Sequence, residues 1–370
     1  MNLYEGRIPT PSIVVNCHQA LANIKKMQGI ANATGCKLRP HIKTHKSPLF
    51  ARMQLENGAV GITCAKLGEA EVMVDAGVDD IFIAYPLVDE TRIQRAISLS
   101  RRCRRLILAV DSIEGANLIS KAANLAGTNL EIRIEVDTGA ARTGLALDKA
   151  VETARIISTL PALHLTGIYT FKSLILKRMP TTDPLAAGKE EGALLAQLRK
   201  SMADAGFDQL EISAGSTPTA ASVAATGSVD EIRPGTYIFN DAMIVSEGIS
   251  HPDEVAARVI ATVVSCPSPE LAIIDGGIKC FSTDPKLNSP PYYYPGYALV
   301  EGNDDLVLDR MSEEHGMLRS KKGNTGLVVG QRLSLVPIHI CTTINLHNSM
   351  VLDWGDRLET IPVAARGMLI

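Results

Sequence analysis

Residues 37–46 have the sequence Lys-Leu-Arg-Pro-His-Ile-Lys-Thr-His-Lys. The flanking pattern predicts a short strand, on which alternate side chains share a face, so that Arg39, His41, Lys43 and His45 would lie together. Because unpaired buried charge is costly, such a face needs an anion such as a phosphate or a carboxylate. Lys43, crowded by cations, is also the type of lysine whose pKa falls far enough for amine chemistry. The alternative interpretation is a charged strand end at the surface.

The predicted strand is the first of eight that alternate with helical patterns. Short apolar runs rich in β-formers occupy residues 37–43, 61–65, 80–85, 105–111, 131–137, 164–171, 210–215 and 231–238. Eight strands separated by helices are typical of a (β/α)8 TIM barrel, an α/β fold, which we predict over residues 11–244. A doubly wound open sheet is the competing architecture, but eight strands within about 230 residues favour the barrel.

The alternation stops after residue 245. Short β-like runs are then separated by turns rich in proline and glycine, and the segment SPPYYYPGY at 289–297 excludes a helix. We predict a mostly β second domain over residues 245–370, to which residues 1–10 return as an extra strand.

Composition excludes several classes of protein. The chain has 370 residues, a formal net charge of −3 and a pI near 6.3, which argue against nucleic acid or an anionic membrane as a partner. No apolar run is typical of a signal peptide or approaches the length of a membrane span. Seven cysteines without CxxC spacing are typical of a reducing compartment, so we expect a cytoplasmic protein.

Two segments at the last two predicted strands have the residues of a phosphate site. In Gly215-Ser216-Thr217, small and hydroxyl-bearing residues let backbone N–H groups approach an anion, and Arg233-Pro234-Gly235-Thr236 adds a cation and a second glycine. Either segment alone is a common turn, but barrels often hold a phosphate at these two positions. A phosphate site together with a reactive Lys43 predicts pyridoxal 5′-phosphate.

Two further segments carry candidate site residues. Arg142 follows the strand at 131–137 and would emerge at the site end of the barrel, where it could pair with a phenolate or a carboxylate. His339 and Cys341 would point the same way on a strand, as two ligands of one metal ion must. A thiolate with an imidazole favours zinc first, with manganese or magnesium as alternatives. Chance or packing also accounts for many His-x-Cys pairs.

Motifs along nearly the whole chain resemble one family. They are TPSIVV, RPHIKTHK, VDTGAARTG, SAGSTPTA, RPGTYIFND, DGGIKCFSTD, EEHG and PIHICTTINLH. The chain resembles the D-threonine aldolase and D-serine dehydratase family, within the alanine-racemase-like, fold type III pyridoxal-phosphate enzymes. The resemblance implies a barrel with a β domain, a homodimer, pyridoxal phosphate, a divalent metal and a small-molecule D-amino-acid substrate.

The resemblance also implies roles for individual residues. Lys43 would bind the cofactor covalently, Arg142 would pair with its 3-oxygen, and His339 with Cys341 would match the family's metal-ligand pair. Segments 215–217 and 235–236 would be the phosphate site, with Gly215, Ser216, Thr217, Gly235 and Thr236. Tyr169 and Arg233 complete the predicted cofactor-binding residues.

Two departures from the family pattern bear on the reaction. D-Threonine aldolases of this group tend to carry His-x-Asp as the metal pair, whereas dehydratases tend to carry His-x-Cys, as here, although residues 343–347 are aldolase-like. Aldolases also tend to have Tyr-His-Gly after the sixth strand, where this chain has Thr170-Phe171-Lys172-Ser173. The histidine base is therefore absent, and Lys172 would suit a second substrate carboxylate, as in a β-hydroxyaspartate.

Several activities follow as hypotheses. The leading one is a metal-assisted lyase for β-hydroxy D-amino acids of the D-threonine aldolase type, which yields glycine and an aldehyde. The alternative is a D-serine or 3-hydroxy-D-aspartate dehydratase, which yields a keto acid and ammonia. An amino-acid racemase would need a second base, such as a tyrosine of segment 289–297, but no metal pair. A non-catalytic pyridoxal-phosphate carrier is typically a bare barrel, unlike this chain.

Overall fold

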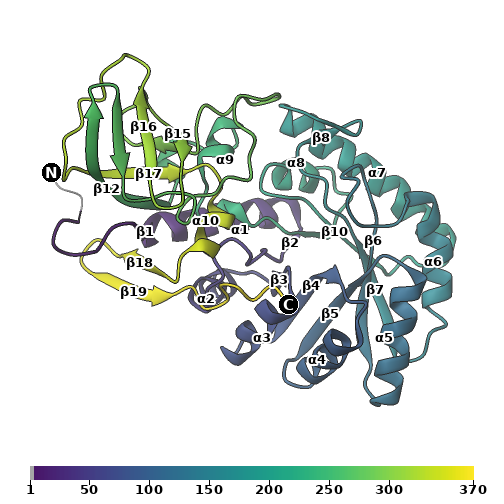
Figure 1. Ribbon diagram of the computed structural model, residues 1–370. Coiled ribbons are helices and arrows are strands. Elements are labelled where there is room, and N and C mark those ends of the chain that lie inside the picture. The colour runs from purple at the N-terminus through teal and green to yellow at the C-terminus, as the bar shows by residue number, and fades with distance from the viewer. Residues whose placement is uncertain (1–3) are drawn as a thin grey trace. The chain divides into compact units, whose positions relative to one another are not determined.

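The computed structural model describes residues 4–370, which form two compact units (Figure 1). The first, called the barrel unit here, comprises Lys25–Lys43, Ser47–Gly235 and Gly367–Ile370. The second, called the sheet unit, comprises the residues up to Ile24, Thr44–Lys46 and Thr236–Arg366. The short segment Thr44–Lys46 therefore belongs to the sheet unit, although the chain on both sides of it belongs to the barrel unit. The boundaries 11–244 and 245–370 stay a prediction.

The barrel unit contains eight parallel strands in the order β2-β11-β10-β7-β6-β5-β4-β3. They are β2 (Lys37–Leu38), β3 (Ile62–Cys64), β4 (Asp80–Pro86), β5 (Arg105–Val110), β6 (Leu130–Glu135), β7 (Leu163–Tyr169), β10 (Glu211–Ala214) and β11 (Glu231–Ile232). A parallel bridge between His41 and Thr63 joins the two edges of this sheet. The predicted (β/α)8 architecture is confirmed, and each strand begins within one residue of its predicted start. The strand predicted at 231–238 ends at Ile232, and Thr236–Ile238 form a 3-10 helix instead.

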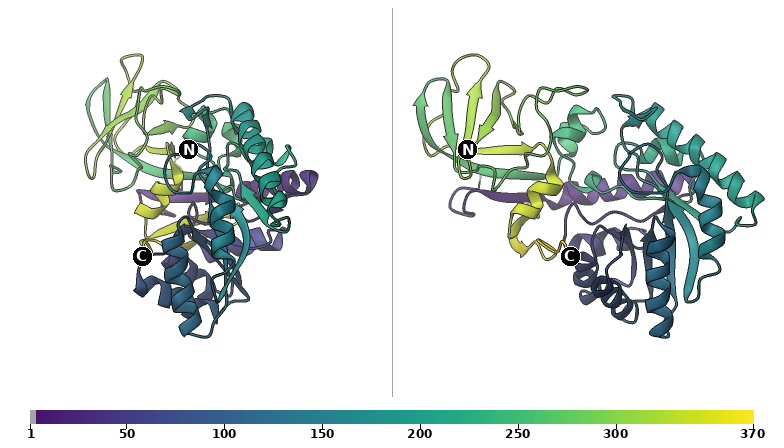
Figure 2. Two further views of the ribbon diagram at one scale, coloured as in Figure 1. Left: turned by 90° about the vertical axis from the view of Figure 1, so that its right-hand side faces the viewer. Right: turned by 45° about the vertical axis from the view of Figure 1, so that its right-hand side comes forward.

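Helices cover the outer face of these strands (Figures 1 and 2). They are α2 (Pro48–Glu56), α3 (Leu67–Asp75), α4 (Glu90–Ser100), α5 (Ile113–Leu125), α6 (Ala150–Ile157), α7 (Pro184–Asp204) and α8 (Ala220–Ala224), with α1 (Cys17–Thr34) leading into the unit. Asp89 and Ser112 cap α4 and α5 by accepting backbone N–H groups of the first turn. No helix within residues 4–370 is long and apolar enough to cross a membrane.

The stretch that follows β2 departs from the predicted strand. β2 ends at Leu38, irregular pairing continues to Ile42, and residues 42–45 form a turn. The turn ends the alternation of side chains, so the predicted common face of Arg39, His41, Lys43 and His45 is wrong.

Arg39 instead lies inside the barrel, where its anions are protein carboxylates. Its guanidinium is 2.5 Å from Asp80 Oδ1 and 2.7 Å from Glu231 Oε2, and Arg133 is 2.5 Å from the other Glu231 oxygen. Burial alone would raise the pKa of Glu231, but the Arg133 and Arg39 guanidiniums hold it well below its ordinary value. The interior charge is therefore compensated within the protein.

The sheet unit is mostly antiparallel, which confirms the predicted β domain. Its strands are β1 (Ser12–Asn16), β12 (Ala257–Ser268), β13 (Leu271–Ile274), β14 (Ala298–Val300), β15 (Leu306–Met311), β16 (Gly316–Ser320), β17 (Arg332–Pro337), β18 (Ser349–Asp353) and β19 (Leu358–Pro362). They form one nine-stranded sheet, in which β1 pairs antiparallel with β12 and parallel with β18. Two short helices, α9 (Ala242–Ser246) and α10 (Ile340–Leu346), complete the unit.

The extra strand expected from residues 1–10 lies further along the chain. Residues 1–3 are outside the described residues, and residues 4–10 form turns and bends, so the prediction is wrong for them. Pro9 and Pro11 have no N–H to donate to a strand ladder, and the strand begins only at Ser12.

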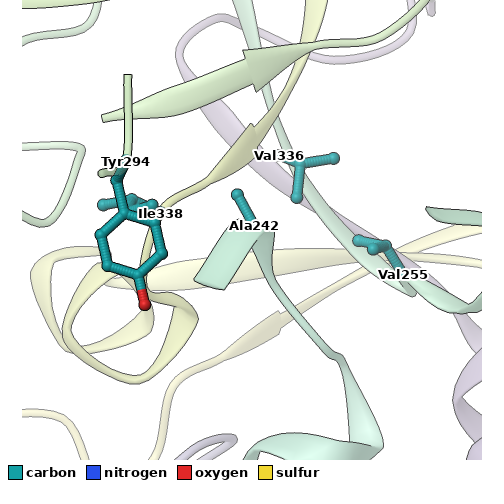
Figure 3. Close-up of a cluster of buried hydrophobic side chains, with 5 residues drawn as sticks. All are labelled: Ala242, Val255, Tyr294, Val336 and Ile338. Atoms are coloured by element: carbon teal, nitrogen blue, oxygen red, sulfur yellow. The ribbon is translucent and has the colours of Figure 1, made fainter. Parts of the chain in front are cut away.

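The aromatic segment at 289–297 inserts Tyr294 into an apolar cluster of the sheet unit (Figure 3). Tyr294 packs there with Ala242, Val255, Val336 and Ile338. Its hydroxyl donates to Glu247 Oε1 at 3.0 Å, and burial raises the pKa of Glu247 to about 7. The Tyr294 hydroxyl is thus already bonded within its own unit.

Candidate active site

Lys43, Arg142 and Phe171 each follow the C-terminal end of a barrel strand and meet there. Lys43 Nζ lies 5.7 Å from the centroid of the Phe171 ring, and the Arg142 guanidinium lies 4.7 Å from the same centroid. A cation over an aromatic face is attracted by the ring quadrupole. The structure therefore brings together two predicted site residues through Phe171, to which the sequence assigned no role.

A buried carboxyl group, that of Glu135, forms an ion pair with Arg142. Glu135, at the end of β6, accepts hydrogen bonds from the Tyr169 hydroxyl at 2.8 Å and from Thr143 at 2.9 Å, and its Oε1 lies 3.9 Å from Arg142. Burial raises the pKa of Glu135, although these donors and Arg142 oppose the shift. Tyr169, predicted to bind the cofactor, is 2% exposed, and the centroid of its ring lies 4.9 Å from that of Phe82 inside the barrel.

The predicted phosphate segment forms a tight loop after β10. Gly215 has a φ of +80°, and a Cβ there would lie 3.0 Å from Val223 Cγ1, so any larger residue would be strained. The backbone N–H of Ser216 donates to Thr219 Oγ1 at 3.2 Å, and the two hydroxyls lie 3.1 Å apart. With backbone N–H groups and the hydroxyls of Ser216, Thr217 and Thr219, this loop offers the donors that a phosphate requires.

The second predicted phosphate segment, residues 233–236, is divided between the barrel unit and the sheet unit. The Arg233 guanidinium is buried in the barrel, donating to Ser213 Oγ and, at 2.5 Å, to the Thr170 carbonyl. Gly235 is buried just after β11, and Thr236 belongs to the sheet unit, where its hydroxyl lies 3.6 Å from Cys341 Sγ. Arg233 is thus engaged inside the barrel and could support the site only through neighbouring residues.

Lys172 is also engaged by the protein. Its ammonium group is buried, forms an ion pair with Glu190 of α7 and donates to the Ala187 carbonyl at 3.3 Å. Glu190 accepts a further bond at 3.0 Å from the backbone of Lys177, in the hairpin of β8 (Ile175–Leu176) and β9 (Met179–Pro180). A substrate carboxylate at Lys172 would therefore have to displace Glu190.

His339 and Cys341 come together at the start of α10 in the sheet unit. Cys341 lies in the first helical turn, so the expected strand geometry is wrong, but the two side chains still form a hydrogen bond. Asp284 Oδ2 is 2.7 Å from His339 Nδ1, and Thr44 Oγ1 is 3.1 Å from Cys341 Sγ. Burial alone would lower the pKa of His339, but negative charge at Cys341 and the hydrogen bonds to Asp284 and Cys341 raise it to about 11.

This donor set fits a metal held by two protein ligands. Because Asp284 occupies Nδ1, an ion would bind Nε2 together with Cys341 Sγ, in place of the hydrogen bond between these two side chains, and a carboxylate on the other ring nitrogen is common for metal-bound histidines. Within residues 4–370, no group of three or more His, Cys, Asp or Glu residues is placed to hold a metal. Two protein ligands leave positions for water or substrate, which is typical of catalytic rather than structural sites.

Besides Phe171, three further residues with direct contacts at these sites had no predicted role. Asp284 lies in the quoted motif DGGIKCFSTD, but it stands 55 residues before His339 and no local spacing relates the two. Thr44 lies next to Lys43 but contacts a thiol 297 residues away. Glu191 is buried on α7 beside Thr219. The sequence did not single it out, because a glutamate within a helix is usually exposed to solvent.

A closed parallel barrel with a lysine after its first strand, followed by an antiparallel sheet, defines the alanine-racemase-like class of proteins. The family described as "Alanine racemase, N-terminal domain" matches residues 15–242, and the chain belongs to it. The family described as "Putative serine dehydratase domain" matches residues 256–352. Pyridoxal phosphate is the cofactor expected of this class.

Several characterised proteins are similar over nearly their whole length. D-Threonine aldolase of Arthrobacter sp is 30% identical, with 98% of this chain and 94% of that protein covered. 3-Hydroxy-D-aspartate aldolase of Paracoccus denitrificans is 31% identical, with 98% and 93% covered. The structure of D-threo-3-hydroxyaspartate dehydratase from Delftia sp. HT23 is 30% identical with a TM-score of 0.87, and the match covers 96% of this chain and 97% of that one.

Proposed function

We propose that this protein is a pyridoxal-phosphate-dependent, metal-assisted lyase acting on β-hydroxy D-amino acids. The observation that carries the proposal is that two consecutive residues, Lys43 and Thr44, contact the predicted cofactor-binding residue Arg142 and the predicted metal ligand Cys341, respectively, Lys43 through the shared Phe171 ring. Lys43 lies with Arg142 at the Phe171 ring, and the next residue, Thr44, contacts the thiol of Cys341. The names of the relatives, aldolases and a dehydratase of such substrates, support the same class.

Pyridoxal phosphate, when bound, supplies an electron sink for bonds broken at the Cα of an amino acid. Lys43 would hold it through Nζ, and the loop at Gly215-Ser216-Thr217 would bind its phosphate. Arg142 would pair with the oxygen on its ring, with Glu135 holding the guanidinium in place. In β-elimination, Lys43 Nζ would also take the proton from Cα as a general base.

A divalent metal, zinc first, supplies a Lewis acid for the substrate hydroxyl when bound. His339 and Cys341 would hold it, while Asp284 orients the imidazole and Thr44 bonds to the thiol. A substituted variant of a D-threo-3-hydroxyaspartate dehydratase has been described in a metal-free form, which supports the use of a metal by this relative.

The aldolase type leads, with a dehydratase as the second candidate. Lys172 is paired with Glu190, which favours substrates without a second carboxylate, such as D-threonine, over a β-hydroxyaspartate. Cys341 favours the dehydratase, because the His-x-Cys pair resembles that subgroup. The hydroxyl of Tyr294 is bonded to Glu247, which argues against this tyrosine as the second base of a racemase.

Product identification tests the proposal. The purified protein is incubated with pyridoxal phosphate and D-threonine, D-serine or the isomers of 3-hydroxyaspartate, with and without a chelator, and with the L-amino acids as controls. We expect glycine and acetaldehyde from D-threonine, lost with chelator and restored by zinc. Pyruvate and ammonia from D-serine would replace the aldolase by the dehydratase. Formation of the enantiomer, unaffected by chelator, would reject both.

A further inference from the structure

Helix α7 approaches the segment after β10 more closely than a helix with side chains could. A Cβ at Gly188 would lie 2.0 Å from Ser222 Oγ, and a Cβ at Gly192 would lie 2.4 Å from Thr226 Oγ1. Glycine is unfavourable inside a helix, so two glycines on one face indicate that close approach is required. This face places Glu191, which lies between them, against the predicted phosphate loop.

Glu191 is a fully buried carboxyl with little compensation. Its Oε2 lies 3.4 Å from Thr219 Oγ1, and the Gly215 N–H faces the same group, but Oε1 has no hydrogen-bond partner within residues 4–370. The charged groups that face it are Lys172 after β7 and Arg233 after β11. Lys172 is already paired with Glu190, the neighbour of Glu191 on α7, and Arg233 with Ser213. Burial raises the pKa of Glu191 to about 7.

The hydroxyls next to Glu191 form a relay whose direction depends on its proton. Thr219 Oγ1 bonds to Glu191 on one side and to the hydroxyl and N–H of Ser216 on the other. When Glu191 is ionised, the single Thr219 proton points to the carboxylate, and the Ser216 hydroxyl donates to Thr219. When Glu191 is protonated, it donates to Thr219, Thr219 donates to Ser216, and the Ser216 proton is released toward an anion.

We propose that Glu191 is a positioning residue for the cofactor's phosphate, and that its proton directs the Thr219–Ser216 relay toward that phosphate. The inference rests on the proposed function, because it takes the loop at Gly215-Ser216-Thr217 as the phosphate site. Two anions side by side also repel each other, so a phosphate in this loop favours the protonated carboxyl. Phosphate binding should therefore weaken as the pH rises through neutrality.

A double comparison isolates this effect from other titrations. Affinity for pyridoxal phosphate is measured by absorbance at pH 6 and pH 8 for the wild type and for Glu191→Gln, whose amide donates to Thr219 at every pH. The ratio of the two affinities, Glu191→Gln over wild type, should increase on the order of tenfold from pH 6 to pH 8, as expected for one hydrogen bond to a charged group. With pyridoxal, which lacks the phosphate, this ratio should not change with pH.

Glu191→Leu provides a second variant, which lacks the donor altogether. It should bind pyridoxal phosphate weakly, and the ratio of its affinity to that of Glu191→Gln should be the same at both pH values. If wild type and Glu191→Gln bind pyridoxal phosphate with a ratio that does not depend on pH, the inference is wrong while the proposed function stands. If the wild type binds pyridoxal phosphate no better than pyridoxal, the phosphate site itself is wrong and both proposals fail.

Discussion

Two glutamates of the barrel unit, Glu231 and Glu191, are both fully buried, yet their surroundings are opposite. Inside the barrel, Glu231 is bonded by Arg39, Arg133 and Ser213, and these partners hold its pKa well below the ordinary value. Beside the loop after β10, Glu191 has the Thr219 hydroxyl and the Gly215 N–H but no ion pair of its own, and burial raises its pKa to about 7.

The difference separates charge that stabilises the fold from charge that is available for chemistry. Both oxygens of Glu231 are bonded by protein groups without any ligand. Lys43 and Arg142, near the C-terminal ends of the strands, instead lie against the Phe171 ring. Charged groups whose charge the protein compensates only in part are typical of functional sites. Four variants, in order of decreasing effect, test this comparison.

Lys43→Arg should have the largest effect. Arginine keeps the positive charge over Phe171 but cannot act as a base or bind the cofactor covalently, so turnover should fall by roughly 10²–10⁴-fold. The control is Lys66→Arg, since Lys66 also lies over a ring, 3.6 Å from Tyr85, without a proposed role. Steady-state rates with D-threonine and the thermal midpoint are measured for both. A Lys43→Arg variant with wild-type turnover would remove Lys43 from the mechanism.

Glu231→Gln should destabilise the fold most. It leaves Arg39 and Arg133 buried without their shared carboxylate, at a cost of about 3–5 kcal/mol in the free energy of unfolding. Glu131→Gln breaks the Arg105–Glu131 pair, which joins the neighbouring strands at 2.7 Å but is partly exposed, and should cost less than about 1 kcal/mol. Urea denaturation measures both. Equal costs would show that the interior network is no different from a surface pair.

Glu191→Gln should change how stability depends on pH in the protein without cofactor. The folded state binds a proton to Glu191 up to about pH 7, whereas the unfolded chain releases it near 4.5. Stability of the wild type therefore falls as the pH rises between these values. The difference in the free energy of unfolding, variant minus wild type, should therefore increase by on the order of 3 kcal/mol from pH 4 to pH 8. Denaturation at both pH values measures it, and a constant difference would contradict the raised pKa.

Tyr169→Phe should have the smallest effect. It removes the donor at 2.8 Å from Glu135, leaving that carboxyl buried with fewer partners, at a cost of about 1–3 kcal/mol in the free energy of unfolding. Tyr85→Phe, at an exposed position, is the control and should be neutral. If both substitutions are neutral, the Glu135 carboxyl does not depend on this hydrogen bond.

The elements of the fold were predictable because their signals are local. Apolar runs at strand spacing placed all eight barrel strands, and helix stops such as Gly77 and Gly206, with φ of +90° and +89°, lie where the pattern ended. The conformation at Lys43 was not predictable in this way, because a turn at 42–45 interrupts a run that has strand-like composition.

The sequence by itself determined the fold class and, through its motifs, singled out Lys43, Arg142, His339 and Cys341. Only the tertiary structure decided what surrounds them: the Phe171 ring near both Lys43 and Arg142, Asp284 on the imidazole and Thr44 on the thiol. It also placed Glu191 beside the loop after β10. The physical reason is range. Strand and helix patterns depend on neighbours within a few residues, whereas ion pairs and hydrogen bonds between distant residues depend on how the completed elements pack.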